Sequence, residues 1–138
     1  GDCFLVAYCD GLSDIDFRHL VRFHRSHDRI ATLTAVRAPC QFGILRLDET
    51  DRVSAFEEKP LLKDWVNGGF YVFDLGVLDY LRDDDMLESD TLPRLVEAGQ
   101  LAAYRHTGFW ACLDTYKDAA YLSELWESGR APWRTWEP

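Results

Sequence analysis

Long apolar runs are absent from this sequence of 138 residues. A helix that spans a membrane needs about 20 apolar residues in succession, and no segment here approaches that length. The N-terminal residues also lack a basic segment ahead of their short apolar stretch, and the acidic Asp2 precedes it instead. These absences argue against a membrane protein and against a secretory signal peptide, so we expect a cytoplasmic protein.

Positive charge is scarce. Lysine and arginine number 15 against 24 aspartates and glutamates, which gives a formal net charge of −9. A surface of this sign repels the phosphates of nucleic acid, so we expect no nucleic-acid partner. Apolar side chains are plentiful by contrast: 47% of the residues are hydrophobic and 14% are aromatic. This composition excludes disorder and suffices for the core of one domain over residues 1–138.

Paired cysteine motifs and phosphate-binding loops are also missing. The four cysteines stand without CxxC spacing, which argues against a zinc site or a redox pair. Cys3, Cys9 and Cys112 lie in apolar runs, so we predict buried free thiols. None of the nine glycines forms a GxGxxG or GxxxxGK loop. The sequence therefore shows no cluster of backbone amides that would cradle a triphosphate.

Strand-like and helix-like segments alternate along the chain, which predicts an α/β fold. The expected strands cover residues 3–8, 31–36, 66–73, 101–104 and 109–113, with a hairpin at 43–47 and 52–56. The expected helices cover residues 14–27, 77–81 and 92–97, with a last helix that begins at Thr115 and ends before Gly129.

Three details of this prediction are specific enough to test. The first strand is expected to be buried, because residues 3–8 are apolar. Ser13 is expected to cap the first helix, with Asp16 three residues later as in a capping box. The C-terminal tail carries Trp133 and Trp136, and free tails rarely contain two tryptophans. We therefore expect the tail to pack on its own domain or on a partner subunit.

Asp10 and Asp114 are the strongest candidates for chemistry. Each follows an apolar strand-like run and precedes a predicted helix. Ligands of open α/β sheets bind beyond the carboxyl ends of the strands, and Mg²⁺ commonly takes one or two carboxylates there. The two aspartates are thus candidate ligands of one Mg²⁺ ion. The alternative is that each is an acid favoured by the dipole at a helix N-terminus.

Two further segments have polar or glycine residues that suit a phosphorylated ligand. Lys59, between Glu58 and a proline, presents a point charge to a phosphate, or lies in a solvated turn. Asn67 precedes Gly68 and Gly69, where a ligand can approach the backbone closely because no side chain intervenes. The alternative for the glycine pair is a β-bulge or a tight bend.

Other charged and titratable groups favour ordinary structural roles. His24 and His27 lie three residues apart on the first predicted helix, and we expect a partly solvated helix face rather than a metal site. Four arginines at helical spacing predict an exposed basic face, with a subunit contact as the alternative. They are Arg18, Arg22, Arg25 and Arg29. The acidic run at residues 83–85 predicts a turn that ends a helix, because the pattern of an EF-hand is absent.

Seven segments follow one another along the chain: CDGLSDID, FHRSH, FGILRLDE, FEEKP, WVNGGFYVF, GFWACLDT and LWESGRAPWRTWE. In this order they resemble the sugar-phosphate nucleotidyltransferases over essentially the whole chain. The motifs EKP and NGG are shared across that family, whereas GFWACLDT and the SGRAPW tail resemble its cytidylyltransferase branch.

The resemblance implies a Rossmann-like, glycosyltransferase-A-like domain with a mixed sheet flanked by helices. Members of the family join a nucleoside triphosphate to a sugar 1-phosphate and release pyrophosphate. Carried over to this sequence, the resemblance implies Mg²⁺ on Asp10 and Asp114. It also implies that the sugar phosphate contacts six further positions: Gly11, Glu58, Lys59, Asn67, Gly68 and Gly69.

The matching residues begin about where the second half of the family's fold begins. The first strand, the Gly-rich loop and the basic signature that hold the triphosphate and the base have no counterpart among these residues. Cys9 stands where the family usually has glycine, and Ala111 replaces a polar residue. We therefore expect a truncated domain with the N-terminal Gly-rich half absent.

Three functions follow as hypotheses. The first is a module that binds a sugar phosphate or nucleotide sugar with Mg²⁺ and has no turnover by itself. The second is an active sugar-phosphate nucleotidyltransferase that is completed by the missing half. The third is an oligomerising scaffold without a ligand. In each case the strand at residues 4–8 keeps one open edge, so we expect a homo-oligomer that covers this edge, helped by the tryptophan tail.

Overall fold

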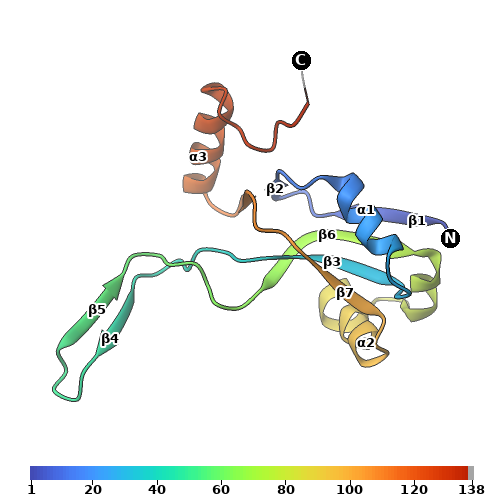
Figure 1. Ribbon diagram of the computed structural model, residues 1–138, viewed down its shortest axis with the longest axis horizontal. Coiled ribbons are helices and arrows are strands. Elements are labelled where there is room, and N and C mark those ends of the chain that lie inside the picture. Colours follow the sequence, from blue (N-terminus) through green and yellow to red (C-terminus); the bar gives the residue numbers. More distant parts are fainter. Residues whose placement is uncertain (137–138) are drawn as a thin grey trace.

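The computed structural model describes residues 1–136, and its elements alternate as the sequence predicts (Figure 1). None of the helices in this range has the length and apolar character needed to cross a bilayer. In chain order the elements are β1 (Cys3–Ala7), β2 (Gly11–Ser13), α1 (Phe17–Arg25), β3 (Ala31–Val36), β4 (Ile44–Leu47), β5 (Val53–Glu57), β6 (Val66–Asp74), the 3₁₀-helix η1 (Leu75–Tyr80), the π-helical turn η2 (Leu87–Thr91), α2 (Leu92–Glu97), β7 (Leu101–Arg105), β8 (Trp110–Cys112) and α3 (Tyr116–Glu127).

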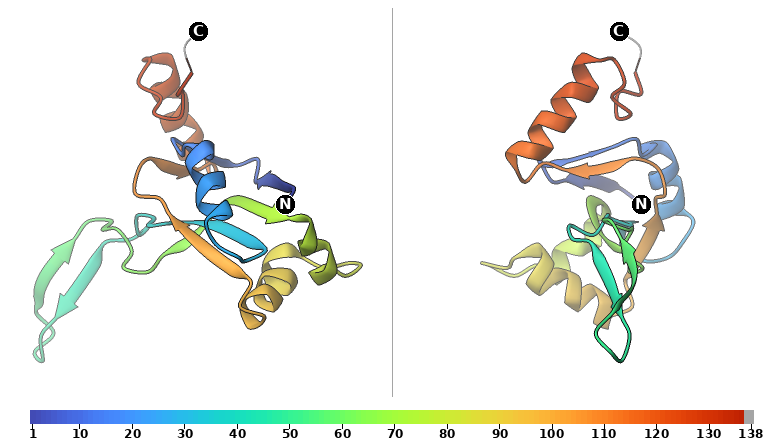
Figure 2. Two further views of the ribbon diagram at one scale, coloured as in Figure 1. Left: turned by 45° about the vertical axis from the view of Figure 1, so that its right-hand side comes forward. Right: turned by 90° about the vertical axis from the view of Figure 1, so that its left-hand side faces the viewer.

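The centre of the fold is a four-stranded mixed sheet with the order β1-β6-β3-β7. β6 runs antiparallel to both β1 and β3, whereas β3 and β7 run parallel. Helix α1 lies on one face of the sheet, and η1, η2 and α2 lie on the other (Figure 2). This arrangement confirms the predicted mixed sheet flanked by helices.

The residues of β6 alternate between the two faces of the sheet, as a strand buried on both sides requires. Tyr71 and Phe73 point toward η1 and α2, where they join one core cluster. Phe70 and Val72 point toward α1, where Leu20 is fully buried against them. The long apolar run of β6 thus supplies the core on both sides of the sheet.

Two predictions for the N-terminal region are wrong. Strand β1 is not buried: it forms one edge of the sheet, and its Phe4 and Leu5 are exposed. Cys9, predicted to be buried, is exposed as well. The apolar composition indicated burial, but in the described residues β1 pairs only with β6. The open edge expected from the family resemblance therefore leaves side chains of this strand exposed.

The predicted cap of α1 is also wrong. The N-cap is Asp16, whose carboxylate accepts a hydrogen bond from the backbone N–H of Arg18 at 2.9 Å. Ser13 lies in β2 instead, opposite Trp110, and its hydroxyl donates to the carbonyl of Phe109 at 2.6 Å. A strand partner 97 residues away in the chain therefore takes Ser13 out of the helix. The four arginines of the predicted basic face are exposed, as expected.

The prediction of a partly solvated face is wrong for His24, whereas His27 is partly exposed as predicted. His24 is only 2% exposed, and its ring lies between the Thr32 hydroxyl (2.8 Å) and the Asp74 carboxylate (3.1 Å). His27 Nε2 lies 2.8 Å from the same hydroxyl, and its Nδ1 accepts from the backbone N–H of Arg29 at 3.1 Å. That acceptor role places the proton of a neutral His27 on Nε2. The hydrogen bonds then run in one direction from His27 through Thr32 and His24 to Asp74.

This network predicts that the protein loses stability below pH 6.5. Burial, followed by the neighbouring His24 and Arg29, lowers the pKa of His27 from its ordinary value of 6.5. The unfolded chain therefore takes up a proton that the folded chain resists, and the stabilisation present above pH 6.5 is lost as the pH falls below it. Melting temperatures at pH 7.5 and 5.5 would measure this loss. We expect His27→Gln to reduce the loss and the exposed control His19→Gln to leave it unchanged; equal losses in all three proteins would contradict the prediction.

The hairpin of β4 and β5 extends away from the sheet in every view (Figures 1 and 2). Helix α3 begins as predicted, because Thr115 and Asp118 form a capping box. The tail packs on its own domain: the ring of Trp133 lies 5.7 Å from that of Phe109, and Trp136 lies 6.5 Å from Trp126. This confirms the expectation that the tail is not free.

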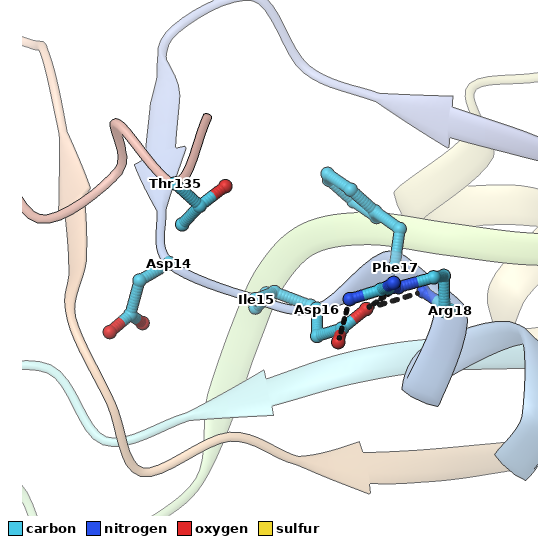
Figure 3. A pocket seen from close by; sticks show the side chains of 6 residues that line it. All are labelled: Asp14, Ile15, Asp16, Phe17, Arg18 and Thr135. Carbon is cyan, nitrogen blue, oxygen red and sulfur yellow. Dashed lines mark hydrogen bonds and ion pairs between the residues drawn. The ribbon is translucent and has the colours of Figure 1, made fainter. Parts of the chain in front are cut away.

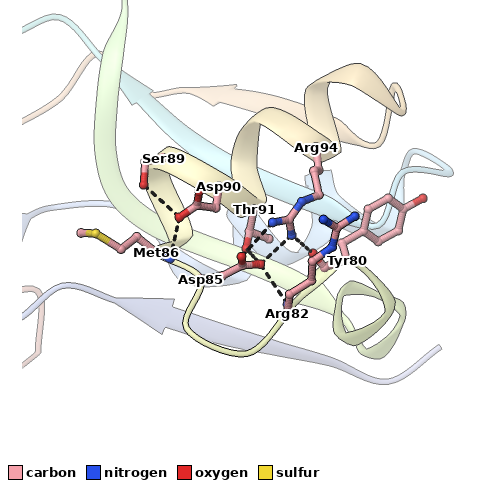
Figure 4. Close-up of polar contacts among 8 residues, drawn as sticks. All are labelled: Tyr80, Arg82, Asp85, Met86, Ser89, Asp90, Thr91 and Arg94. Carbon is pink, nitrogen blue, oxygen red and sulfur yellow. Dashed lines mark hydrogen bonds and ion pairs between the residues drawn. The ribbon is translucent and has the colours of Figure 1, made fainter.

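The acidic run ends a helical segment, as predicted, and its last residue also holds the helical layer together (Figure 4). Asp85 accepts two hydrogen bonds from the guanidinium of Arg94, at 2.6 and 2.8 Å. Arg94 also donates to the carbonyl of Tyr80. The guanidinium is the main reason that the pKa of Asp85 falls to about 2. The run therefore has a structural role that accounts for Asp85 without a calcium ion.

Candidate functional site

The short β2–β8 ladder brings the two candidate metal ligands together. Asp10 immediately precedes β2, and Asp114 follows β8 by two residues. Gly11 pairs with Cys112 across the ladder, and the Leu113 N–H donates to the Asp10 carbonyl at 2.8 Å. Asp10 is therefore followed by a strand and not by the predicted helix, so the helix-terminal alternative does not apply to it.

The carboxylate oxygens of Asp10 and Asp114 and the sulfur of Cys112 all lie within 4.8 Å of one another. Burial, with smaller contributions from the two aspartates, raises the pKa of Cys112 to about 12, so this residue stays a neutral thiol at pH 7. The charged donors are thus the two exposed carboxylates. Hard oxygen ligands of this kind fit Mg²⁺, which binds one or two carboxylates and fills its remaining positions with water and phosphate oxygens.

A pocket of about 210 Å³ opens beside these carboxylates. Five of the eight predicted site residues line it: Asp10, Gly11, Asn67, Gly68 and Gly69. Asp114 is not among the lining residues but joins the cluster at Asp10. Glu58 and Lys59 follow β5 at the base of the hairpin, where both are exposed and neither lines the pocket. The structure thus assembles six of the eight residues and leaves two apart.

The glycine pair forms the predicted bulge and also lines the pocket. Opposite residues 33 to 35 of β3, the register in β6 runs from Tyr71 to Asn67, so Gly68 and Gly69 accommodate a bulge. A Cβ on Gly68 would lie 3.0 Å from the carbonyl oxygen of Thr34. Gly69 has a φ of +79°, and a Cβ there would lie 2.9 Å from a ring carbon of Tyr8. Both interpretations of this pair therefore hold at once.

Gly69→Ala is predicted to destabilise the protein by about 1–2 kcal/mol or more, because an L residue is strained at positive φ and its Cβ crowds Tyr8. Gly76→Ala is the matched control, since its Cβ would meet only ordinary contacts with Ile30 at 3.6 Å or more. Urea denaturation of both variants would measure the difference. Equal stability of the two variants would contradict the strain at Gly69.

Sequence reasoning did not single out the remaining lining residues of the pocket. They are Tyr8, Phe70, Glu88, Trp110 and Cys112. The Trp110 indole N–H donates to the Gly68 carbonyl at 2.9 Å and so fixes the bulge from the opposite wall. Tyr8 and Cys112 each stand two residues before a candidate aspartate, a spacing that was available in the sequence. Glu88 lies 19 residues after the NGG motif in an acidic stretch and had no such signal.

A second hollow, of about 410 Å³, lies between the start of α1 and the tail (Figure 3). Its charged groups already have partners: Arg18 binds Asp16, and Asp14 lies 2.8 Å from Nε2 of His106. None of the candidate site residues lines it. The pocket at Asp10 is therefore the candidate site.

Known proteins share both this sequence and this fold. Glucose-1-phosphate cytidylyltransferase of Salmonella typhi is 41% identical over 138 residues, which cover 99% of this chain and 53% of that protein. The catalytic subunit beta of mannose-1-phosphate guanylyltransferase of Drosophila melanogaster is 32% identical over 132 residues, or 88% of this chain and 36% of that protein. The chain thus spans about half, or less, of the length of these curated relatives.

Among solved structures, HddC from Yersinia pseudotuberculosis superposes with a TM-score of 0.64 at 22% identity. The match covers 91% of this chain and 56% of that chain, and it confirms the fold expected from the sequence resemblance. The sequence profile of the nucleotidyl transferase family matches residues 1–128. On this evidence the chain belongs to the nucleotidyl transferase family.

Proposed function

We propose that this chain binds a sugar 1-phosphate, or the sugar end of a nucleotide sugar, together with Mg²⁺. The observation that carries the proposal is the convergence of Asp10 and Asp114 beside the pocket of the NGG motif. Two carboxylates alone would repel a phosphate, so the ligand requires a cation between them. Curated relatives that carry the names of sugar-1-phosphate cytidylyl- and guanylyltransferases support this substrate class.

The size of the pocket supports a sugar rather than a whole nucleotide. Its volume of about 210 Å³ is below the range of roughly 300–1,000 Å³ that is typical of small-molecule sites. Gly68 and Gly69 leave the wall without side chains, so a sugar ring can approach the backbone. Glu58 and Lys59 stay predicted contacts of the sugar and its phosphate, on the resemblance to the family.

Asp10 and Asp114 would hold Mg²⁺ through their carboxylates, and the ion would neutralise phosphate oxygens of the ligand. Asn67, which lines the same pocket, would orient the sugar through its amide. These residues provide binding and alignment, which supply most of the catalysis in phosphoryl-transfer chemistry. The 138 residues contain no Gly-rich loop for a triphosphate, so we expect them to have no turnover by themselves.

The direct test of binding is ³¹P NMR of glucose 1-phosphate titrated with the protein, with and without Mg²⁺. We expect the phosphate resonance to shift or broaden only when protein and Mg²⁺ are both present. An unchanged resonance in every mixture would refute the proposal and favour the hypothesis of a scaffold without a ligand.

The second candidate is an active glucose-1-phosphate cytidylyltransferase, in which another segment or polypeptide supplies the Gly-rich half. The identity of 41% to the Salmonella enzyme favours it. Pyrophosphate release from CTP and glucose 1-phosphate distinguishes the two candidates. We expect none from these 138 residues with Mg²⁺, whereas release would establish turnover by this chain alone. The four free thiols fit activity in the reducing cytoplasm.

We also propose that the chain self-associates through β1. This strand ends the sheet, and its Leu5 is 50% exposed. An open apolar edge favours pairing with a second strand. Light scattering at micromolar concentration should show a dimer or larger species that Leu5→Lys weakens. Val96→Lys, on the distant α2 and 64% exposed, is the control and should leave association unchanged. A monodisperse wild-type monomer would rule out self-association.

A further inference from the structure

The polar side chains beneath the pocket form a directed series of hydrogen bonds. The Asn67 Oδ1 accepts from the backbone N–H of Gly69 at 3.0 Å, which fixes the orientation of the amide. Its Nδ2 therefore faces the Tyr71 hydroxyl and donates to it at 2.5 Å. The Tyr71 hydroxyl in turn donates to the Tyr8 hydroxyl at 3.2 Å. Each donor is thus committed in one direction, starting from the bulge.

Glu88 lines the same pocket as Tyr8 and Asn67, the two ends of this series. Because Tyr8 accepts from Tyr71, its own proton is left to donate into the pocket. Tyr71 is fully buried, so the middle of the series is shielded from solvent. The series therefore orders two of the polar groups that share the pocket with the exposed carboxylate of Glu88.

The carboxylate of Glu88 retains unused capacity. An ionised carboxylate has about four acceptor positions. Within residues 1–136 no salt bridge engages Glu88, and it does not belong to the cluster of Asp10 and Asp114. It lines the pocket from η2, a π-helical turn, and such turns are frequent at functional sites. An ionised carboxylate can only accept hydrogen bonds, and sugar hydroxyls are donors that it can accept from.

We propose that Glu88 is a specificity-determining residue that accepts a hydrogen bond from a hydroxyl group of the bound sugar. Tyr8 and Tyr71 are positioning residues, because their hydrogen bonds hold the amide of Asn67 and leave the Tyr8 proton to reach the carboxylate across the pocket. The inference rests on the proposed function, because it assumes that a sugar occupies the pocket. The role of Glu88 specifies which group selects the sugar, and it explains why a sugar that lacks the matching hydroxyl binds weakly.

The test is a matrix of affinities, measured by isothermal titration in Mg²⁺. The ligands are glucose 1-phosphate and its 2-, 3-, 4- and 6-deoxy analogues, and the proteins are the wild type, Glu88→Gln, Tyr8→Phe and the control Glu97→Gln. Glu97 lies at the end of α2 and is exposed. We expect Glu88→Gln to lower the affinity for glucose 1-phosphate by about tenfold or more, because a hydrogen bond to a charged group is lost.

The decisive result is the pattern across the analogues. One deoxy sugar should bind the wild type weakly and should lose nothing further in Glu88→Gln, because its partner hydroxyl is already missing. Tyr8→Phe should show a smaller loss with the same dependence on that hydroxyl, which a merely structural defect would not produce. Equal weakening of all five ligands in Glu88→Gln, or none, would overturn the inference alone. Failure of the wild type to bind any sugar phosphate would overturn the proposed function and this inference together.

Discussion

Asp114→Ala is expected to abolish the dependence of ligand binding on Mg²⁺. Asp10 and Asp114 are the two charged donors of the cluster, and both are exposed. Removal of even a group that supports a metal ligand lowers metal affinity by about 10–100-fold, so loss of one of two direct ligands should reach at least that size. Titration of glucose 1-phosphate at several Mg²⁺ concentrations would measure the effect.

The matched control for this substitution is Asp79→Ala. Asp79 is also an exposed aspartate, but it lies in η1, outside the pocket and the cluster. The Asp79→Ala substitution removes the same negative charge as Asp114→Ala, so it measures any general electrostatic effect on ligand binding. We expect its Mg²⁺ dependence to equal that of the wild type. If Asp114→Ala behaved like Asp79→Ala, the assignment of the metal ligands would be wrong.

Leu20→Ala is expected to cause the largest loss of stability among single substitutions in α1. Leu20 is fully buried between the helix and the sheet, against Phe70 and Val72. Truncation of a buried leucine costs about 2–5 kcal/mol, because the lost burial and the residual cavity add. For a chain of this length, a loss in that range lowers the melting temperature by about 10 °C. Calorimetry or thermal circular dichroism would measure it.

The effect of Leu20→Ala should extend to the candidate site. Phe70, which packs against Leu20, also lines the pocket. We therefore expect weaker binding of the sugar phosphate by Leu20→Ala even below its melting temperature. Leu45→Ala, on the hairpin at 52% exposure, is the control and should change stability by less than about 0.5 kcal/mol. Equal losses in the two variants would contradict the described core.

Much of the fold was predictable because local patterns decided it. The apolar run of β6 is long enough to identify a strand buried on both faces. Thr115 and Gly129 mark the ends of α3 because capping chemistry is local. The hairpin was predictable from its turn, since Asp48 accepts from the N–H groups of Thr50 and Arg52 inside the loop.

The wrong predictions share a non-local cause. Ser13 has the composition of a helix cap, but its partner Trp110 comes from the other end of the chain. His24 follows Phe17, Leu20 and Val21 at helical spacing, but a partly solvated ring was predicted for it. Thr32 and Asp74 bury it instead. In each case the deciding contact joins distant residues, and a short window of sequence does not contain it.

The candidate site was predictable to the extent that its motifs resemble a family. Asp10, Asp114 and the NGG motif were candidates from their positions in the sequence, and the resemblance assigned them roles. The structure brings them together. Tyr8 was not a candidate, because its role depends on a hydrogen-bond series through the buried Tyr71. Glu88 was not a candidate either, because only the folded chain brings it to the pocket. Lys59 shows the opposite case: its motif is recognisable, yet the structure leaves it outside the pocket.

The central claim is that the pocket beside Asp10 and Asp114 binds a sugar phosphate through Mg²⁺. Isothermal titration of the wild-type protein with CDP-glucose and glucose 1-phosphate, with and without Mg²⁺, tests it most directly. We predict heat of binding for at least one of the two ligands, present with Mg²⁺ and lost without it. No heat for either ligand in the presence of Mg²⁺ would contradict the claim and leave the chain as an assembly module.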